Sequence, residues 1–324
     1  MNEQDKTAKD QAAIPLRLCA LTAMSPLHVG ADGGFGLVDK PVMRERATGY
    51  PLLPGSALKG VLRDSFAPPA DGEGRGGGPR TPFDFAFGGV AAAGEDNAGS
   101  LIFTDAQLLA LPVRSYYGTT AWVSTPHLLE RHAAQLARFA EAAMPEPPSL
   151  ASQEIRLLKD SVLGHDGQVV LEDFDLLPQP ETAAMRRWAE WMAQRFWPDP
   201  GAGGDGQRGQ FLRRFALVPE LVFDHLCRYG LELRARVKID SGSRTVAPGH
   251  LWYEELLPEG SLLLAYVFCE KVFRRGKDDA PSPAALLDQF CTRSRYLQFG
   301  GMASIGRGLC RVDFDDPHAA GAQT

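Results

Sequence analysis

The alternation of hydrophobic and polar positions predicts strands toward both ends of the chain. Near the N-terminus, residues 16–24 (LRLCALTAM) alternate loosely and end at a Ser-Pro turn. Residues 231–239 (LELRARVKI) alternate cleanly, so their aliphatic side chains share one face. The opposite face carries three cations, Arg234, Arg236 and Lys238. We expect the aliphatic face to be buried in a sheet, with residues 261–273 as the partner strand.

A helical period of hydrophobic residues alternates with these strands. Helices are predicted over residues 56–66, 127–144, 183–197, 211–230 and 282–297. In the first of them, Ser56 is the expected N-cap, which leaves Lys59 and Arg63 free to point away from the apolar side. A last strand is predicted at residues 308–314. Because strands and helices interleave without a run of βα repeats, the pattern favours an α+β fold.

The distribution of Gly, Pro and polar residues suggests one elaborated domain. We expect a frayed N-terminus over residues 1–13, a single domain over 14–316, insertions at about 67–100 and 146–209, and a tail over 317–324. The first insertion is dense in Gly, Pro and Ala, so it can bury little apolar surface. The 324-residue chain is long enough to bury a substantial core.

Composition and charge narrow the functional classes. The chain is 44% hydrophobic and 23% charged, as globular proteins are. No apolar run approaches the ~20 residues that cross a bilayer, so we expect a cytoplasmic protein without membrane contact. The five cysteines are scattered without metal-type spacing and are expected to be free and buried. A net charge of −6 argues against nonspecific nucleic-acid binding, yet residues 271–311 hold eight basic and three acidic side chains.

The most suggestive chemistry lies in a glycine-rich turn that precedes an acid. The turn contains Gly30, Gly33, Gly34 and Gly36. Glycines can take positive φ and leave backbone N–H groups open to an anion. Asp39 follows, and one carboxylate beside bound phosphate can act as a base or hold Mg²⁺ through water. The alternative is an ion pair of Asp39 with Lys40, Arg44 or Arg46 that fixes the loop.

Five blocks, in order along the chain, carry a resemblance to a known family. They are GLVDKPVMRERATGYPLLPGSALKGVLR from residue 36, LIFTDAQLLALPVRS from 101, AWVSTPHLLER from 121, VAPGHLWYEELLPEGSLL from 246 and FGGMASIGRGLCRV from 299. Together they resemble the RAMP proteins of type III CRISPR effector complexes, and within these the Cmr-type backbone subunit that cleaves target RNA. The resemblance implies a ferredoxin-like (RRM-like) palm, in which residues 16–45 and 231–312 pair in one sheet. It also implies helical and thumb-hairpin insertions, and residues 160–180 are one candidate for the thumb.

The same resemblance assigns roles to individual residues. Asp39 matches the position of the catalytic aspartate. His28 also lies in a matching position as a general acid or base, although a hydrogen-bonded histidine beside a glycine turn explains it equally well. Glu255 is either a second carboxylate at the site or a solvated or structural residue, and the same holds for Glu254.

The remaining candidates are residues expected to bind RNA. The guide backbone or RNA phosphates are expected to contact Arg44, Arg46, Lys59, Arg63, Arg234, Arg236, Lys238, Gly300, Gly301, Gly306, Arg307 and Gly308. An exposed helix face is the alternative for Lys59 and Arg63, and tight turns are the alternative for the glycines. Mg²⁺ or another divalent cation is the expected cofactor, with Asp39 as its ligand.

The function that the resemblance implies is that of a repeated backbone subunit in a type III-B (Cmr) effector. Its partners would be guide crRNA, complementary target RNA, other Cmr subunits and head-to-tail copies of itself. Target RNA would be cut with the RNA 2′-OH as nucleophile. The alternatives are a crRNA-binding subunit that does not cleave, a crRNA-processing RAMP endonuclease that acts as a monomer, and the similar Csm-type backbone subunit.

Overall fold

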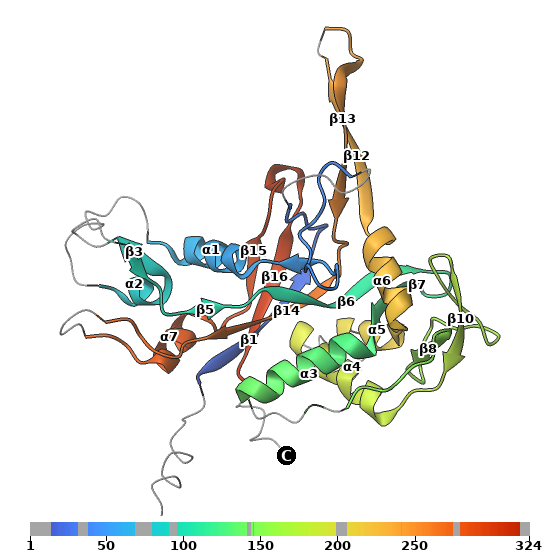
Figure 1. Ribbon diagram of the computed structural model, residues 1–324, viewed down its shortest axis with the longest axis horizontal. Coiled ribbons are helices and arrows are strands. Elements are labelled where there is room, and N and C mark those ends of the chain that lie inside the picture. The colour runs from blue at the N-terminus through green and yellow to red at the C-terminus, as the bar shows by residue number, and fades with distance from the viewer. Residues whose placement is uncertain are drawn as a thin grey trace, which may run out of the picture.

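A long twisted sheet runs through the molecule, with helices packed on both of its faces and one hairpin projecting away from it (Figure 1). The computed structural model describes residues 14–31, 38–68, 80–90, 96–140, 144, 146–198, 206–240, 242–274 and 279–317. The predicted frayed N-terminus, Gly33, Gly34 and Gly36 of the first glycine turn, residues 69–79 and 91–95 of the first insertion and nearly all of the predicted tail lie outside these ranges.

The two ends of the chain meet at the centre of the sheet. Strand β1 (Leu16–Ala23) pairs antiparallel with β14 (Leu262–Phe268) on one side and with β16 (Leu309–Asp315) on the other. Because β1 is covered on both faces, nearly all of its residues are buried, which explains why its alternation is only loose. The predicted pairing of the N-terminal and C-terminal segments is confirmed for these strands.

The sheet continues on both sides of this centre. Its order is β15 (Arg295–Gln298), β16, β1, β14, β6 (Ala106–Ser115), β7 (Thr119–Ser124), β11 (Phe215–Leu217), β8 (Glu154–Leu157), β10 (Phe174–Gln179) and β9 (Val169–Leu171). Short strands β2 (Leu52–Leu53) and β5 (Ile102–Phe103) join β6 and β14, and β3 (Gly88–Val90) pairs with β4 (Asp96–Ala98). Most neighbours are antiparallel, but β7–β11 and β8–β10 are parallel, so the fold is mixed α/β.

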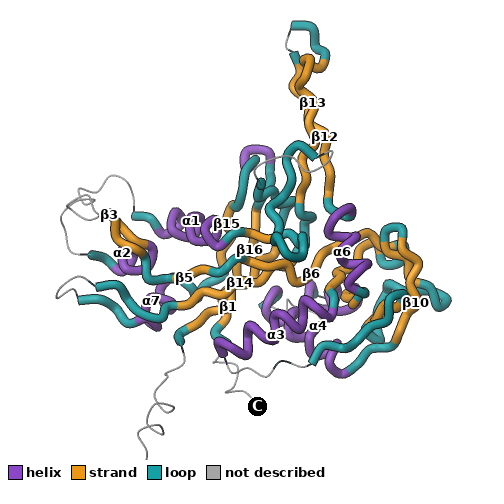
Figure 2. The backbone as a smooth tube through the Cα atoms, in the orientation of Figure 1, coloured by secondary structure: helices purple, strands orange, loops and turns teal. Residues whose placement is uncertain are grey.

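Two apolar clusters lie on opposite faces of the sheet. The helices are α1 (Gly55–Phe66), α2 (Pro82–Phe87), α3 (Pro126–Ala140), α4 (Ala183–Phe196), α5 (Gln207–Arg214), α6 (Glu220–Tyr229) and α7 (Pro283–Phe290). Alternate residues of β1 enter different clusters. Leu21 belongs to the cluster that also holds residues of α1, α2, α6 and α7, whereas Leu18 belongs to the one that holds residues of α4 and α5. Figure 2 shows α1 and α4 on different sides of the strands. The five cysteines are free and buried, as predicted.

Two predicted helices are shorter in the structure. The prediction over residues 211–230 is wrong in its middle, where α5 ends at Arg214 and the buried strand β11 precedes α6. Pro219 is the N-cap residue of α6, and its fixed φ suits a new helix start better than a helix interior. The prediction over residues 282–297 is also wrong beyond Phe290, because residues 295–298 pair with β16 as the edge strand β15.

The N-cap residue predicted for α1 is wrong. Pro54, not Ser56, is the N-cap residue, and it provides no side-chain cap. Instead, the Asp105 carboxylate accepts the N–H of Gly55 at 2.8 Å. An acid beside the first helical N–H groups satisfies a free donor and complements the helix dipole. Because Asp105 lies 50 residues away in the sequence, no local pattern could identify it.

The projecting hairpin contradicts the expected burial of residues 231–239. β12 (Glu232–Ile239) pairs with β13 (Val246–Leu256), whereas the expected partner, β14, pairs with β1. The aliphatic face of β12 is therefore open, and Leu233, Val237 and Ile239 are 52%, 46% and 54% exposed. The segment suggested for a thumb, residues 160–180, instead contributes β9 and β10 to the end of the large sheet.

Candidate functional site

Residues 38–44 lie between two backbone segments at the base of the projecting hairpin. On one side they pair with residues 29–31, since Met43 N–H donates to Val29 O at 2.7 Å. On the other side Lys40 bridges to Glu254 of β13, and the backbone N–H of Glu255 donates to Lys40 O at 3.0 Å. The segment therefore has a fixed place, although it belongs to no regular strand of the large sheet.

Asp39 lies at the exposed rim of this segment. Its Oδ2 accepts the backbone N–H of Tyr253 at 2.8 Å, which anchors one carboxylate oxygen to β13. The sequence also allowed an ion pair between Asp39 and a neighbouring cation. In the structure, Lys40 and Arg44 have other partners. Lys40 Nζ lies 3.5 Å from Glu254 Oε1, and Arg44 pairs with Glu255. A carboxylate that is positioned by one backbone donor and open to solvent can meet a ligand without a change in the fold.

Arg44 and Glu255 form the buried support beneath Asp39. The Arg44 guanidinium donates to Glu255 Oε1 at 2.6 Å and to the carbonyl oxygens of Gly49 and Cys227 at 2.8 Å each. Glu255 Oε2 accepts the backbone N–H of Val42 at 3.0 Å. Both Glu255 oxygens are thus engaged inside the protein. This pair positions the segment, and Arg44 is placed in the interior rather than toward solvent.

His28 connects β13 to the C-terminal glycine loop. The side chain is buried, and its Nδ1–H donates to the carbonyl oxygen of Glu255 at 2.8 Å. The carbonyl oxygen of His28 in turn accepts the N–H of Gly301 at 3.2 Å. A Cβ at Gly300 would lie 2.0 Å from that same carbonyl oxygen, so only glycine permits this approach. Asp39, His28 and the C-terminal glycine loop therefore belong to one hydrogen-bonded unit with β13.

The loop between β15 and β16 exposes much of its backbone. Gly300, Met302, Gly306 and Gly308 have φ values of 69°, 68°, 77° and 76°, and a short 3₁₀ turn covers Ala303–Ile305. Gly300, Gly301 and Gly306 are exposed, whereas Gly308 is buried and Arg307 is half-buried. The N–H groups of Gly301, Gly306 and Gly308 donate to the carbonyl oxygens of His28, Ala303 and Pro26, so an anion could meet only other N–H groups of this loop. Figure 1 shows this red loop beside the blue N-terminal loops, near the base of the hairpin.

The cations predicted to bind RNA occupy different environments. Lys59 is half-buried on α1 and donates to the carbonyl oxygen of Leu101 at 3.2 Å, and burial lowers its pKa. This contact ties α1 to the chain before β5 and is not the free position that the sequence suggested. Arg63, one turn later, and Arg46, beyond Glu45, are both exposed.

The three cations of β12 lie on the hairpin. Arg234 contacts Glu232 on its own strand, and Lys238 is exposed. Arg236 Nε lies 3.6 Å from Glu254 Oε2, so one cation of the row is directed to a carboxylate of β13. Not all of the basic side chains in residues 271–311 face solvent. The Arg295 guanidinium stacks over the Phe66 ring, 3.8 Å from the ring centroid.

Glu254 is a buried charge that sequence reasoning undervalued. It was expected to be solvated or structural, and it is only 4% exposed. Its Oε1 accepts the indole N–H of Trp252 at 2.7 Å, with Lys40 and Arg236 nearby. Lys40 Nζ also lies 5.1 Å from the Trp252 ring centroid. The adjacent pair of glutamates was the available signal. Neighbouring side chains of a strand point to opposite faces, so at least one of the two glutamates faces the protein and needs a partner there.

The described residues contain neither a cluster of metal ligands nor a membrane-spanning helix. Within the ranges that the structure describes, no group of three or more His, Cys, Asp and Glu side chains is arranged to hold a metal ion. Mg²⁺ is commonly bound by one or two carboxylates together with substrate phosphates, and Asp39 fits only that kind of site. Among the same residues, no helix has the length and apolar character that a bilayer crossing requires.

Comparison with known proteins gives one consistent result. The profile of the RAMP superfamily matches residues 20–311. The chain is 30% identical over 306 residues to the protein named CRISPR system Cmr endoribonuclease Cmr4 from Pyrococcus furiosus, a match that covers 91% of this chain and 94% of that protein. It is 25% identical over 307 residues to the CRISPR system CMR subunit Cmr4 from Saccharolobus solfataricus, covering 90% and 94%.

Solved structures agree at the level of the fold. The crystal structure of oligomeric Cmr4 from Pyrococcus furiosus superimposes with a TM-score of 0.67 and 24% identity, covering 94% of this chain and 99% of that one. A chain in the cryo-EM structure of the type III-B Cmr-beta complex bound to cognate target RNA gives a TM-score of 0.63 at 18% identity, covering 93% and 98%. The arrangement of strands, helices and loops is therefore shared over nearly the whole chain.

Proposed function

The chain belongs to the RAMP superfamily, and from that premise we propose that it is the repeated backbone subunit of a type III-B CRISPR effector. In this role it binds a guide crRNA and cuts the complementary target RNA. The observation that carries the proposal is the geometry of Asp39, an exposed carboxylate with one oxygen fixed by the Tyr253 N–H at 2.8 Å. Its relatives in the Cmr family include a protein named an endoribonuclease.

The reaction needs little from the protein, because RNA carries its own nucleophile in the 2′-OH. Tyr253 N–H holds Asp39 Oδ2 in place, and Oδ1, which has no hydrogen-bond partner among the residues that the structure describes, is the oxygen that would accept the proton of that hydroxyl. General base catalysis by such a group is worth roughly 10²–10⁴-fold in rate. We assign the exposed backbone around Gly300 to the neighbouring phosphates, whereas the Gly301 N–H is engaged by the His28 carbonyl oxygen.

The supporting residues then divide by role. His28, Arg44 and Glu255 are buried or half-buried and hydrogen-bonded, so we assign them to positioning Asp39 rather than to proton transfer. Guide and target phosphates are assigned to the cations that lie at the surface, together with the glycine loop. The cations are Arg46, Arg63, Arg234, Lys238 and the half-buried Arg307, and the exposed glycines of the loop are Gly300, Gly301 and Gly306. Gly308 is buried and its N–H donates to the Pro26 carbonyl oxygen, so it shapes the loop instead.

A divalent cation, Mg²⁺ above all, is proposed as a cofactor held jointly by the protein and its RNA. Asp39 would be the ligand from this chain, and the ion would supply charge neutralisation at the phosphate. The chain's own contribution does not depend on the ion, since Tyr253 fixes the carboxylate in either case.

The same proposal gives roles to the sheet and to the projecting hairpin. Strands β16, β1, β14 and β6 would form a ferredoxin-like palm, and the β12–β13 hairpin would be the thumb that separates successive RNA segments. Other Cmr subunits and copies of this chain would bind head to tail in the cytoplasm.

Two other functions make different predictions. A binding subunit without nuclease activity would assemble on the guide but leave the target whole. A guide-processing endonuclease would cut repeat RNA as a purified single chain. The position of Asp39 supports the nuclease, because its exposed carboxylate can reach bound RNA without a change in the fold.

Reconstitution tests the proposal. The intact chain is assembled with its partner subunits, a guide RNA and an end-labelled target, with and without EDTA. We expect cuts at regular intervals, and products with 2′,3′-cyclic phosphate and 5′-OH ends. Asp39→Ala should bind target with unchanged affinity and cut it at least about 100-fold more slowly. A target left whole by the intact complex, or cutting of repeat RNA by the single chain, would favour one of the alternatives.

A further inference from the structure

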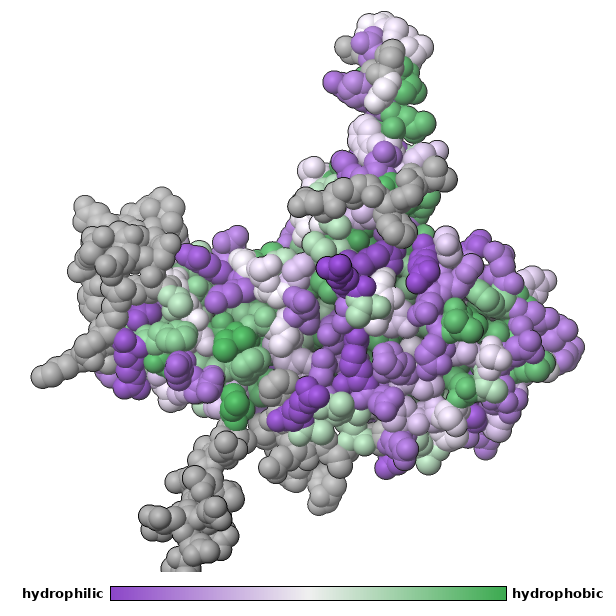
Figure 3. All heavy atoms as spheres, in the orientation of Figure 1, coloured by the Kyte–Doolittle hydropathy of each residue, from purple (hydrophilic) through white to green (hydrophobic). Residues whose placement is uncertain are grey.

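Glu254 brings two cations together at the base of the projecting hairpin. The register of β12 and β13 places Arg236 opposite Trp252, and Glu254, two residues further along β13, lies on the same face. Figure 3 shows hydrophilic and hydrophobic side chains on different sides of this projection. Lys40 reaches the same group, with its Nζ 3.5 Å from Glu254 Oε1 and 5.1 Å from the Trp252 ring centroid. One buried carboxylate therefore faces two cations, which leaves the group with a net positive charge.

Neither cation is fully engaged by this carboxylate. The Lys40 and Arg236 side chains are 48% and 41% exposed, whereas that of Glu254 is 5% exposed. Lys40 Nζ and Arg236 Nε lie 3.5 Å and 3.6 Å from the Glu254 oxygens, beyond the ~2.7–2.9 Å of a charge-assisted hydrogen bond. The hydrogen bond that Glu254 does accept, at 2.7 Å, comes from the Trp252 indole N–H. The carboxylate thus gathers the two cations but leaves their N–H groups available to an anion.

Lys40 is fixed to the same stretch of β13 as Asp39. Its backbone N–H donates to Tyr253 O at 3.1 Å, and its carbonyl oxygen accepts the N–H of Glu255 at 3.0 Å. The Tyr253 N–H in turn donates to Asp39 Oδ2 at 2.8 Å. Asp39 lies at a bend of the chain, so the two neighbouring side chains need not point to opposite faces. Both charged groups therefore project from one fixed element beside residues 252–254.

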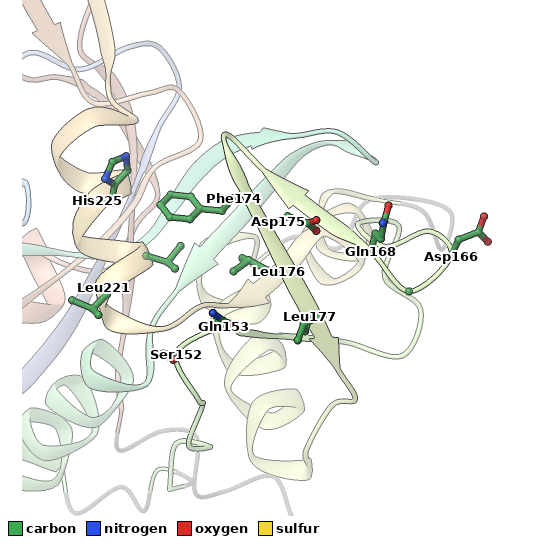
Figure 4. Close-up of a pocket in the computed structure, with 12 residues that line it drawn as sticks. Ser152, Gln153, Asp166, Gln168, Phe174, Asp175, Leu176, Leu177, Leu221 and His225 are labelled. Carbon is green, nitrogen blue, oxygen red and sulfur yellow. The ribbon is translucent and has the colours of Figure 1, made fainter.

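A hollow elsewhere on the molecule has the opposite chemistry. The groove between the β9–β10 hairpin and α6 has a volume of about 840 Å³ (Figure 4). Two carboxylates, Asp166 and Asp175, line it, and its described lining includes neither Lys nor Arg. Because affinity for phosphates comes mainly from Lys and Arg, this groove does not suit a sugar-phosphate chain. The cations gathered by Glu254 carry the charge that the groove lacks.

We propose that Lys40 is a second catalytic residue, whose ammonium group binds a nonbridging oxygen of the phosphate that is cut. The inference rests on the proposed nuclease function and adds a residue to that site. The 2′-oxygen forms a bond to phosphorus while the bond to the 5′-oxygen breaks. Asp39 takes the proton of the 2′-OH and later returns it to solvent, and water supplies the proton of the departing 5′-oxygen. Negative charge grows on the nonbridging oxygens during this step, and a fixed cation beside them lowers the barrier.

Single-turnover cutting by the reconstituted complex tests the role of Lys40. Lys40→Met removes the charge and keeps much of the aliphatic chain. Bound target should be cut about 100-fold more slowly, with an affinity for target within about threefold of that of the intact complex. Lys40→Arg should cut faster than Lys40→Met because it keeps the charge. Lys159→Met is the matched control, since it removes the same charge from an exposed position after β8 and should cut like the intact complex.

Sulfur substitution at the cut phosphate gives a readout that a structural role of Lys40 would not move. Targets carrying sulfur in place of either nonbridging oxygen are cut separately by the intact and variant complexes. Sulfur is a weak hydrogen-bond acceptor, so the intact complex should cut one of the two forms at least about tenfold more slowly than the all-oxygen target. The Lys40→Met complex should cut that form and the all-oxygen target at the same rate, because the contact is already absent.

A second variant guards against a folding defect. Lys40→Met combined with Glu254→Gln removes the buried charge together with one of its partners, while the glutamine oxygen can still accept the Trp252 N–H. This variant should match the intact chain in urea unfolding and should cut as slowly as Lys40→Met alone.

The outcomes separate the role of Lys40 from the proposed function. The role is overturned if Lys40→Met, alone or with Glu254→Gln, cuts within about threefold of the intact complex. It is also overturned if sulfur slows the intact and Lys40→Met complexes equally, or if Lys159→Met cuts as slowly as Lys40→Met. In each of these cases Asp39→Ala would still prevent cutting, and the proposed function stands. A target left whole by the intact complex overturns the proposed function, and with it the role of Lys40.

Discussion

Replacing the half-buried Arg44 with Met should destabilise the protein strongly, because its guanidinium is paired with a buried carboxylate. The Arg44 and Glu255 side chains are 18% and 9% exposed, and their atoms lie 2.6 Å apart. Met keeps much of the apolar stem but leaves the Glu255 carboxylate with only the Val42 N–H as a donor. Breaking a buried ion pair by removing one partner costs about 3–5 kcal/mol. The partial exposure of Arg44 places the expected loss at the lower end, about 3 kcal/mol.

A double-mutant cycle in urea unfolding measures this contact. Glu255→Gln removes the charge but keeps the shape, and it should relieve part of the cost of Arg44→Met. The loss in the double variant should be at least about 1 kcal/mol smaller than the sum of the single losses. Arg46→Met is the matched control, because Arg46 is exposed and its replacement should change stability by less than about 0.5 kcal/mol. A loss below about 1 kcal/mol for Arg44→Met, or strict additivity, would refute the reasoning.

Two further predictions concern the glycine loop and a buried histidine. Gly300→Ala should lower stability by more than about 1 kcal/mol and weaken RNA binding at fixed salt, because its Cβ would lie 2.0 Å from the His28 carbonyl oxygen at a φ of 69°. Gly60→Ala, at an exposed position of α1 with no atom within 4 Å, is the control; it should be no less stable than the intact chain in thermal unfolding and should bind RNA equally well. Burial, reinforced by the neighbouring positive charge of Arg131, lowers the pKa of His132 to about 4. The unfolded chain therefore binds the extra proton first, so stability should be full above about pH 6.5 and fall by up to about 3 kcal/mol as the pH approaches 4. Urea unfolding of His132→Leu across this range should show a flatter pH dependence, and an unchanged slope would contradict the assignment.

The parts of the fold that were predictable are those in which local pattern and burial agree. β1 and β16 contain apolar residues that the core requires, and the ends of the chain met as expected. The hairpin shows the limit of this reasoning. Alternation in residues 231–239 defined two faces correctly, but alternation does not reveal whether an apolar face is covered by the same chain. An aliphatic row that stays exposed has the same pattern as one in a core.

The site was predictable in its residue types and less so in its contacts. Asp39 was chosen as a candidate through the family resemblance rather than through its residue type, and its anchor, Tyr253, lies 214 residues later. The link from His28 to Glu255 spans 227 residues, so no local spacing indicated that the histidine ring was engaged. Lys59 had the position of an exposed helical cation, yet its amino group donates to a backbone carbonyl. Such assignments depend on which distant segments the fold brings together.

The most direct test of the account is the single-turnover rate of target cutting by a complex that carries Asp39→Asn. The amide oxygen of Asn can still accept the Tyr253 N–H, so the loop, the assembly and the affinity for target should remain those of the intact complex. Only the charge of the free oxygen is lost. We predict a rate at least about 100-fold lower at unchanged affinity for target. A rate within about threefold of the intact complex would contradict the assignment of Asp39 as the catalytic base.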